Sequence, residues 1–297
     1  MSQQTHVITL ISHPGEGQIT DRTINDLADH LGRKLDVTQL ADGIACDISV
    51  NEGEATHAAL MAPQLDQQRI DMAIQFIKGR RKSVLIADMD STMIEQECID
   101  ELADAVGIKD KVSDITARAM RGEIEFDPAL RERVGLLKGL DLSIIDEVVR
   151  DKITLRTGGR ELVQTMKANG GYTALVSGGF TMFTARIAAM LGFDENRANT
   201  LGIDGNQLSG SVADPILGSA AKVTALEENC VMKGLAPSDV MAIGDGANDL
   251  GMIELAGSGV AVHAKPKVAA AADMAINHGD LTALLYLQGY SKDDFIR

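Results

Sequence analysis

The main structural signal in this chain is Ser83-Val84-Leu85-Ile86-Ala87-Asp88-Met89-Asp90-Ser91-Thr92. Its apolar, strand-forming residues end in two aspartates with one residue between them. Side chains two residues apart on a strand share a face, so Asp88 and Asp90 are expected to point into one site. In a parallel sheet that site lies at the carboxyl edge, where open α/β sheets bind ligands. Two such carboxylates favour a cation between them, and Mg²⁺ prefers oxygen ligands. An ordinary acidic turn is the alternative.

Composition narrows the class of protein. The chain has 297 residues and a formal net charge of −15, which is enough for one large domain or two to three smaller ones. The acidic balance argues against nucleic acid or an anionic membrane as the partner, but not against a small anionic substrate in a local pocket. Apolar runs stay shorter than the roughly 18 residues of a membrane-spanning helix.

Two further features predict a cytoplasmic location. Cys46, Cys98 and Cys230 are widely spaced and contain no CxxC pair, so we expect reduced thiols and neither a disulfide framework nor a zinc site. The first residues, Met1 to His6, lack the basic head and apolar core of a secretion signal.

The first eighty residues predict a small α+β domain with β-α-β-β-α order. The expected elements are, in order, residues 6–11, 21–31, 34–39, 43–50 and 60–78. This order resembles the ligand-sensing ACT domain. The turn at residues 13–17 departs from the Asp-Arg-Pro-Gly pattern frequent in that family, so packing or dimerisation stands beside amino-acid sensing as its role. The charged segment Gly79-Arg80-Arg81-Lys82 marks the predicted boundary between residues 1–80 and a second domain, 81–297.

Helical patterns follow the Asp88 strand for about sixty residues. Apolar positions recur at helical spacing over residues 93–106, 112–120, 130–137 and 143–150. Asp127-Pro128 is the expected start of the third helix, with Asp127 as the N-cap. An all-helical insertion of about residues 95–155 is expected to lie above the crevice as a lid.

From about Gly158 strands and helices alternate again, which predicts a Rossmann-like parallel sheet with helices on both faces. The expected strands are residues 172–176, 240–243, 259–262 and 274–276, with helices 162–169 and 181–191 and one beginning at Lys222. A two-stranded hairpin is expected around Asp204-Gly205-Asn206.

Four polar features fall at the carboxyl ends of these strands or at the first turn of the next helix. They are Asp88 with Asp90, Ser177, Lys222, and Asp245 with Asp249. Singly, they fit tight turns, helix caps or a solvated lysine. Together they form a phosphoryl-transfer set that contains a carboxylate nucleophile, a second carboxyl group as acid and base, and donors for the phosphoryl oxygens.

The pattern of these residues resembles the haloacid dehalogenase-like hydrolases, and within that superfamily the phosphoserine phosphatase family. The resemblance covers about residues 83 to 290. It rests on residues 90–94 with Glu97, 99–103, Phe126 with 129–130 and 133–134, 176–180, 243–250, and His263-Ala264-Lys265-Pro266. Met89 departs from the commoner Phe, and its side chain is expected to face away from the site.

The resemblance implies a role for each residue at the catalytic end. Asp88 would be the phosphorylated nucleophile and Asp90 the general acid and base. The carboxylates of Asp88 and Asp245 and the carbonyl of Asp90 would hold Mg²⁺. Asp249 would orient a metal-bound water or Lys222.

It also implies the substrate contacts. Ser177, the Gly178 amide and Lys222 would hold the phosphoryl oxygens, with Asn248 beside the phosphate or the substrate. On the lid, Arg133 would pair with a substrate carboxylate, Glu97 with an ammonium, and Phe126 would cover the apolar side. An Arg fork suits a carboxylate and a Glu suits an ammonium. Without the resemblance, Arg133 and Glu97 fit solvated helix charges, and Phe126 fits core packing.

The implied function is a Mg²⁺-dependent phosphatase that hydrolyses O-phospho-L-serine through an aspartyl phosphate, the last step of serine biosynthesis. The alternatives are a phosphatase or phosphotransferase for another small phosphomonoester, such as phosphoethanolamine, or with homoserine as acceptor. A regulatory amino-acid-binding protein on an inactive scaffold is a third. A homodimer through the N-terminal domain and serine as a feedback ligand are further hypotheses.

Overall fold

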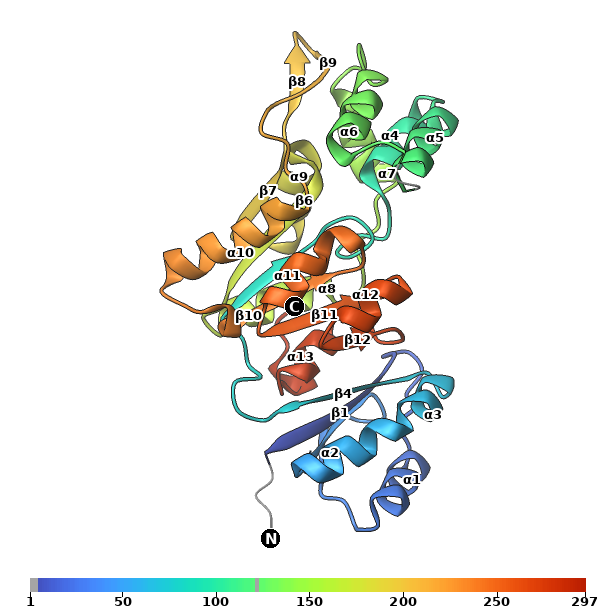
Figure 1. Cartoon of the computed structure of the whole chain (residues 1–297), viewed down its shortest axis with the longest axis vertical. Helices are drawn as coiled ribbons and strands as arrows, with labels where there is room; N and C mark the ends of the chain where they lie inside the picture. Colours follow the sequence, from blue (N-terminus) through green and yellow to red (C-terminus); the bar gives the residue numbers. More distant parts are fainter. Residues whose placement is uncertain (1–4, 121–122) are drawn as a thin grey trace.

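The computed structural model describes residues 5–120 and 123–297. Residues 1–4 of the N-terminal segment considered above lie outside the described residues. Figure 1 shows an elongated molecule with a small sheet at one end, a larger sheet in the middle and a group of helices at the opposite end. The three cysteines are free and buried, as predicted. Across the described residues, no helix is long and apolar enough to cross a bilayer.

The small sheet is antiparallel and has the strand order β2-β3-β1-β4. Its strands are β1 (His6–Ser12), β2 (Val37–Ala41), β3 (Ala45–Val50) and β4 (Ile70–Phe76), and its helices are α1 (Asp21–Leu31), α2 (Glu52–Ala58), the 3-10 turn η1 (Ala59–Met61) and α3 (Ala62–Gln67). Thr20 caps the start of α1, and Gly32, with φ of 67°, ends it. The helices cover one face of this sheet and enclose a separate apolar core.

The helix predicted over residues 60–78 is wrong. The chain is helical only to Gln67, and β4 pairs with β1 as an edge strand. Ile70 and Ile74 fit helical spacing, but they also share one side of a strand with Met72. Short apolar runs leave this ambiguity, and here pairing with β1 decides it. The helix α2 was not predicted.

The large sheet is parallel throughout, with the order β12-β11-β10-β5-β6-β7. Its strands are β5 (Val84–Ala87), β6 (Tyr172–Phe180), β7 (Glu195–Asn199), β10 (Val240–Gly244), β11 (Ser258–Val262) and β12 (Met274–Ile276). The helices of this region are α8 (Gly159–Ala168), α9 (Thr181–Leu191), α10 (Ser219–Lys233), α11 (Leu250–Leu255), α12 (Pro266–Ala271) and α13 (Ala283–Leu287), with 3-10 turns at Pro237–Asp239, Ala247–Asp249 and Lys292–Asp294. The predicted α/β architecture with a parallel sheet and helices is confirmed.

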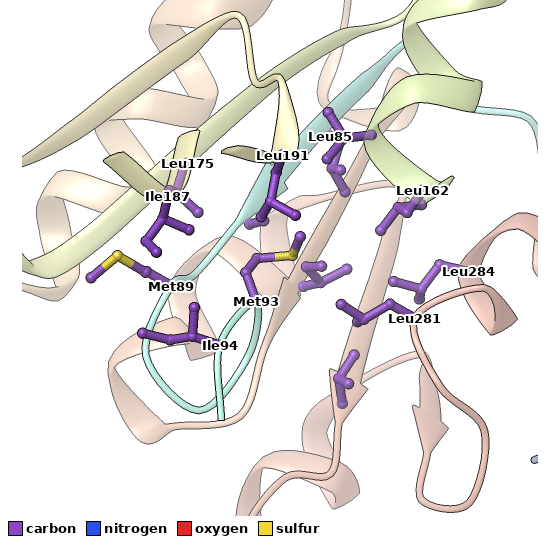
Figure 2. Close-up of a cluster of buried hydrophobic side chains, with 14 of the residues drawn as sticks. Leu85, Met89, Met93, Ile94, Leu162, Leu175, Ile187, Leu191, Leu281 and Leu284 are labelled. Atoms are coloured by element: carbon purple, nitrogen blue, oxygen red, sulfur yellow. The ribbon is translucent and has the colours of Figure 1, made fainter. Parts of the chain in front are cut away.

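Successive residues of β5 face opposite sides of this sheet. Leu85 and Ala87 pack in the core beneath α8, α9 and α13, whereas Val84 and Ile86 pack beneath α10 and α11. Figure 2 shows Met89, Met93 and Ile94 from the turn after β5 in the same cluster as Leu85. Met89 is fully buried in this apolar cluster, as expected of a side chain that faces away from the site.

The described residues of the insertion between β5 and α8 form four helices, which we call the cap: α4 (Cys98–Ala105), α5 (Lys109–Met120), α6 (Phe126–Gly135) and α7 (Ser143–Asp151). Two predicted boundaries are wrong. The first helix begins at Cys98 and not at residue 93, because Met93 and Ile94 enter the core of the large sheet. The N-cap of α6 is Glu125 and not Asp127, which lies in the first turn.

The predicted hairpin is confirmed as β8 (Leu201–Asp204) and β9 (Gln207–Val212). It extends from the large sheet toward the cap (Figure 1). The amide of Gly139 donates to the carbonyl of Leu208 (2.8 Å), and the amide of Leu208 donates to that of Leu140 (2.8 Å). The hairpin therefore fixes the segment between α6 and α7 by backbone hydrogen bonds.

Candidate active site

Adjacent parallel strands bring the predicted site residues together. Asp88 follows β5, Asp245 follows β10, and Ser177 lies in the last part of β6. Since β10 and β6 flank β5, these side chains meet at one carboxyl edge, as predicted. The amide of Asp88 donates to the carbonyl of Ile243 (3.1 Å), so the β5–β10 pairing holds the backbone of Asp88 itself.

Lys222 is buried between two aspartates. Its Nζ lies 2.5 Å from Oδ1 of Asp88 and 2.5 Å from Oδ1 of Asp249. Burial would lower the pKa of Lys222, but the two negative charges and their hydrogen bonds raise it. Burial raises the pKa of Asp88, and the charge of Lys222 opposes this rise. The ammonium is therefore the fixed counter-charge that allows Asp88 to ionise inside the protein.

Asp90 has a different environment from Asp88. Its Oδ1 accepts a hydrogen bond from the amide of Cys98 (3.0 Å), and its Oδ2 accepts one from Oγ of Ser177 (3.3 Å). Burial raises the pKa of Asp90, against the lowering effect of the Cys98 amide. Ser177 Oγ in turn accepts a hydrogen bond from the amide of Gly179 (2.8 Å). A carboxyl group held by an amide and a hydroxyl, beside one that is ion-paired to Lys222, is the arrangement expected of an acid and its nucleophile.

Three carboxylates form a cluster suited to a metal ion. Oxygen atoms of Asp88, Asp245 and Asp249 all lie within 4.8 Å of one another. Thr92 Oγ1 donates to Asp245 Oδ1 (3.3 Å), and the amide of Gly246 donates to Asp249 Oδ2 (3.0 Å). Burial and the charge of Asp249 raise the pKa of Asp245. An all-oxygen, anionic donor set fits a hard divalent cation.

A cavity of about 430 Å³ lies between the cap and the carboxyl edge of the large sheet. Its walls include most of the predicted site residues, namely Asp88, Asp90, Glu97, Phe126, Arg133, Ser177, Gly178, Asp245 and Asn248. Lys222 and Asp249 lie behind this wall in the protein interior. The structure thus brings every predicted site residue to one place.

The cap contributes Phe126, Arg133 and Glu97. The ring of Phe126 on α6 lies close to Gly178 in β6 and to Gly218 just before α10. Arg133 donates to the Ala129 carbonyl (3.3 Å) and to Thr116 Oγ1 (3.4 Å) within the cap, and burial lowers its pKa.

Glu97 is accessible to solvent and lines the cavity. Even so, the surrounding protein and the charge of Asp90 raise its pKa to about 7, against a 2.8 Å hydrogen bond from Ser91 Oγ. Among the described residues, the cap therefore presents the Arg133 cation and the acids Glu97 and Asp100 to the cavity.

Three residues near the site were not given roles by sequence reasoning. Arg156 donates to the carbonyls of Ser91 (2.8 Å) and Thr92 (3.0 Å), just after Asp90. Asn199 is buried and donates to the carbonyl of Gly178 (2.9 Å). These two act on backbone atoms and belong to no acidic or glycine-rich pattern. Lys265 lines the cavity. It belongs to the His263-Ala264-Lys265-Pro266 stretch that carries part of the family resemblance, so the sequence could have indicated it as a site residue.

A sequence model of the haloacid dehalogenase-like hydrolases matches residues 85–254. This match covers β5, the cap and β6 through α11, and the chain belongs to that family.

The relatives narrow the comparison. The chain is 36% identical over 295 residues to the phosphoserine phosphatase of Streptomyces coelicolor, covering 97% of this chain and 71% of the relative. It is 44% identical over 223 residues to that of a Polaromonas species, covering 73% of this chain and 94% of the relative. Its fold is similar to the crystal structure of a probable phosphoserine phosphatase from Vibrio cholerae, with a TM-score of 0.81, 30% identity and coverage of 98% and 88% of the two chains.

Proposed function

We propose that this protein is a phosphoserine phosphatase that hydrolyses O-phospho-L-serine to serine and phosphate through an aspartyl phosphate, with Mg²⁺ as its metal. The single observation that carries the proposal is the composition of the cavity. One end has the Asp88 and Asp90 carboxyl groups with Ser177, and the cap adds Arg133 and Glu97. A phosphorylated amino acid has the matching groups, namely a phosphate, a carboxylate and an ammonium.

The residues support a two-step displacement. The ion pair with Lys222 uses Oδ1 of Asp88, and the other oxygen attacks phosphorus. The bond from phosphorus to the serine oxygen breaks as Asp90 gives that oxygen its proton. A water molecule then attacks the aspartyl phosphate, Asp90 takes the proton of this water, and phosphate leaves with Asp88 restored. The amide of Gly178, Ser177 and Lys222 stabilise the phosphoryl oxygens.

Asp88 and Asp245, with the Asp90 carbonyl, would hold Mg²⁺. Asp249 would orient a metal-bound water or Lys222, with which it forms an ion pair. The cluster of Asp88, Asp245 and Asp249 supports a divalent cation at this place. When bound, Mg²⁺ would offset the repulsion between the nucleophile and the anionic phosphate.

The test is phosphate release from phosphoserine, phosphothreonine, phosphoethanolamine and p-nitrophenyl phosphate, with Mg²⁺ and with EDTA. Phosphoserine is expected to lead in kcat/KM, to require metal, and to lose its lead in Arg133→Ala. Metal-dependent turnover that is equally fast with substrates lacking a carboxylate would contradict phosphoserine as the preferred substrate. It would still support metal-dependent phosphatase chemistry. Failure to turn over any of the four would favour the amino-acid-binding alternative.

We also infer the organisation around this chemistry. Residues 1–80 are proposed as a separate ACT-like domain, and residues 81–297 as the catalytic domain with its cap at about 95–155. A role in serine biosynthesis in the cytoplasm follows from the proposed reaction and the free cysteines.

The N-terminal domain is proposed to mediate dimerisation, which sedimentation of the full chain would test. Serine feedback is checked by whether deletion of residues 1–80 leaves serine inhibition unchanged.

A further inference from the structure

More acidic than basic side chains line the cavity, although the substrate that it is proposed to bind has an anionic phosphate. Five carboxyl groups line it: Asp88, Asp90, Glu97, Asp100 and Asp245. Among the described residues of its wall, the cationic side chains are Arg133 and Lys265. The whole chain has a formal net charge of −15. A phosphate dianion approaching this site therefore meets a negative field unless a local cation offsets it.

The cations near the site differ in availability. Lys222 is buried, and two aspartates hold its ammonium. Arg133 is bonded within the cap to Ala129 and Thr116. Lys265, by contrast, is exposed, and its ammonium makes no hydrogen bond or ion pair with another described residue.

The backbone of Lys265 is nevertheless fixed beside the acidic cluster. Its amide donates to the carbonyl of Asp245 (3.2 Å). Its carbonyl accepts hydrogen bonds from Val268 (2.9 Å) and Ala269 (3.1 Å) at the start of α12. A free ammonium on an anchored backbone at the cavity wall is suited to attract an anion and then release it.

We propose that Lys265 is a positioning residue that draws the phosphate group of the substrate into the cavity and contributes to binding it. This inference rests on the proposed phosphomonoester chemistry, but not on serine as the substrate. Because Lys265 is solvent-exposed, its contribution acts through the electric field and falls with ionic strength.

The test compares Lys265→Glu with Lys267→Glu. Lys267 lies two residues further along, is also exposed and does not line the cavity, so both variants change the net charge equally. At about 20 mM salt, K265E is expected to lower kcat/KM about tenfold through KM, with kcat within about twofold of wild type, and most of this loss should disappear at about 500 mM salt. Lys265→Arg should keep the wild-type values, and K267E should stay within about twofold.

Equal losses in K265E and K267E would overturn the proposal, as would an unchanged KM in K265E or a loss that salt does not relieve. Phosphoserine and p-nitrophenyl phosphate are both used as substrates. If K265E has the same effect with both substrates, the role of Lys265 does not depend on which phosphomonoester is the natural substrate. If wild type turns over neither, the proposed function fails. In that case calorimetric binding of inorganic phosphate to wild type, K265E and K267E still decides whether Lys265 attracts the anion.

Discussion

At the scale of single residues, the two aspartates that open the site differ through their neighbours. Asp88 lies against the ammonium of Lys222, whereas Asp90 accepts hydrogen bonds from an amide and a hydroxyl. Both carboxyl groups have raised pKa values because both are buried, but only Asp88 has a cation in contact. The charged form of Asp88 thus has a counter-charge in contact that Asp90 lacks, which fits the different roles of a nucleophile and an acid.

Asp88→Asn tests the nucleophile directly. The amide fills the same space, and Lys222 keeps its ion pair with Asp249, so we expect a folded protein by circular dichroism. Phosphate release should fall by a factor on the order of 10⁴ or more, because an amide cannot form the acyl phosphate. Turnover close to the wild-type rate would mean that Asp88 is not the nucleophile.

If Glu97 pairs with the ammonium of the substrate, kcat/KM should depend on the ionisation of Glu97 and therefore on pH. Its pKa is raised to about 7, so the side chain is neutral below that pH and charged above it. For phosphoserine, kcat/KM should therefore rise about tenfold between about pH 6 and pH 8 beyond any rise seen with p-nitrophenyl phosphate. The second substrate controls for titration of the phosphate and of the catalytic acids, since it has no ammonium. In Glu97→Gln the difference between the two profiles should vanish; identical profiles in wild type would contradict this role.

At the scale of elements, the sequence predicted correctly those elements that are determined by residues close together in the chain. Apolar runs that end in Asp88, Ser177 and Asp245 contain both the strand and its functional end, so these three were placed correctly. The segment from Ile70 to Ile77 fits two periods at once, and only the distant strand β1 decides between them. The hairpin reaching the cap and the contacts of Arg156 join residues far apart in the chain, which no local pattern reveals.

Arg156 joins the two connections between the cap and the large sheet. These connections form an antiparallel bridge at Ile94 and Leu155, and Gln96 and Thr154 exchange hydrogen bonds beside it. Arg156 holds the carbonyl of Ser91, whose φ of 57° is costly for a residue with a side chain. The guanidinium thus stabilises the turn that directs Asp90 into the site.

Arg156→Ala is expected to lower kcat about tenfold and to lower the melting temperature, because the turn after Asp90 loses both donors. Arg160→Ala is the control. Arg160 donates to the Met190 carbonyl (2.7 Å) from α8 without touching that turn, so its kcat should stay within about twofold of wild type. Steady-state kinetics and thermal unfolding of both variants check this. Equal kcat values in the two variants would show that the Arg156 contacts do not position Asp90.

At the scale of the whole molecule, polar contacts join the small sheet to the large one. Asp71 on β4 is buried and accepts hydrogen bonds from the amides of Asn277 (2.8 Å), His278 (3.0 Å) and Gly279 (2.7 Å), just after β12. Gln75 Nε2 also donates to the Leu287 carbonyl (2.7 Å) at the end of α13. The two sheets are therefore joined by directional bonds that fix their relative position.

Asp71→Ala should weaken this junction more than any surface change nearby. It leaves three amides without their acceptor, and unsatisfied buried donors cost about 1–3 kcal/mol each when water cannot replace the partner. Water can enter the space left by the side chain, so we expect a loss of about 2–4 kcal/mol in the free energy of unfolding. The control is Asp66→Ala. Asp66 is exposed and contacts the ring of His278 (2.9 Å) in the same loop, so its loss should stay below about 1 kcal/mol. Urea unfolding followed separately by circular dichroism and by activity measures both variants. If Asp71→Ala matched Asp66→Ala in stability, the Asp71 hydrogen bonds would not be what holds the small sheet in place.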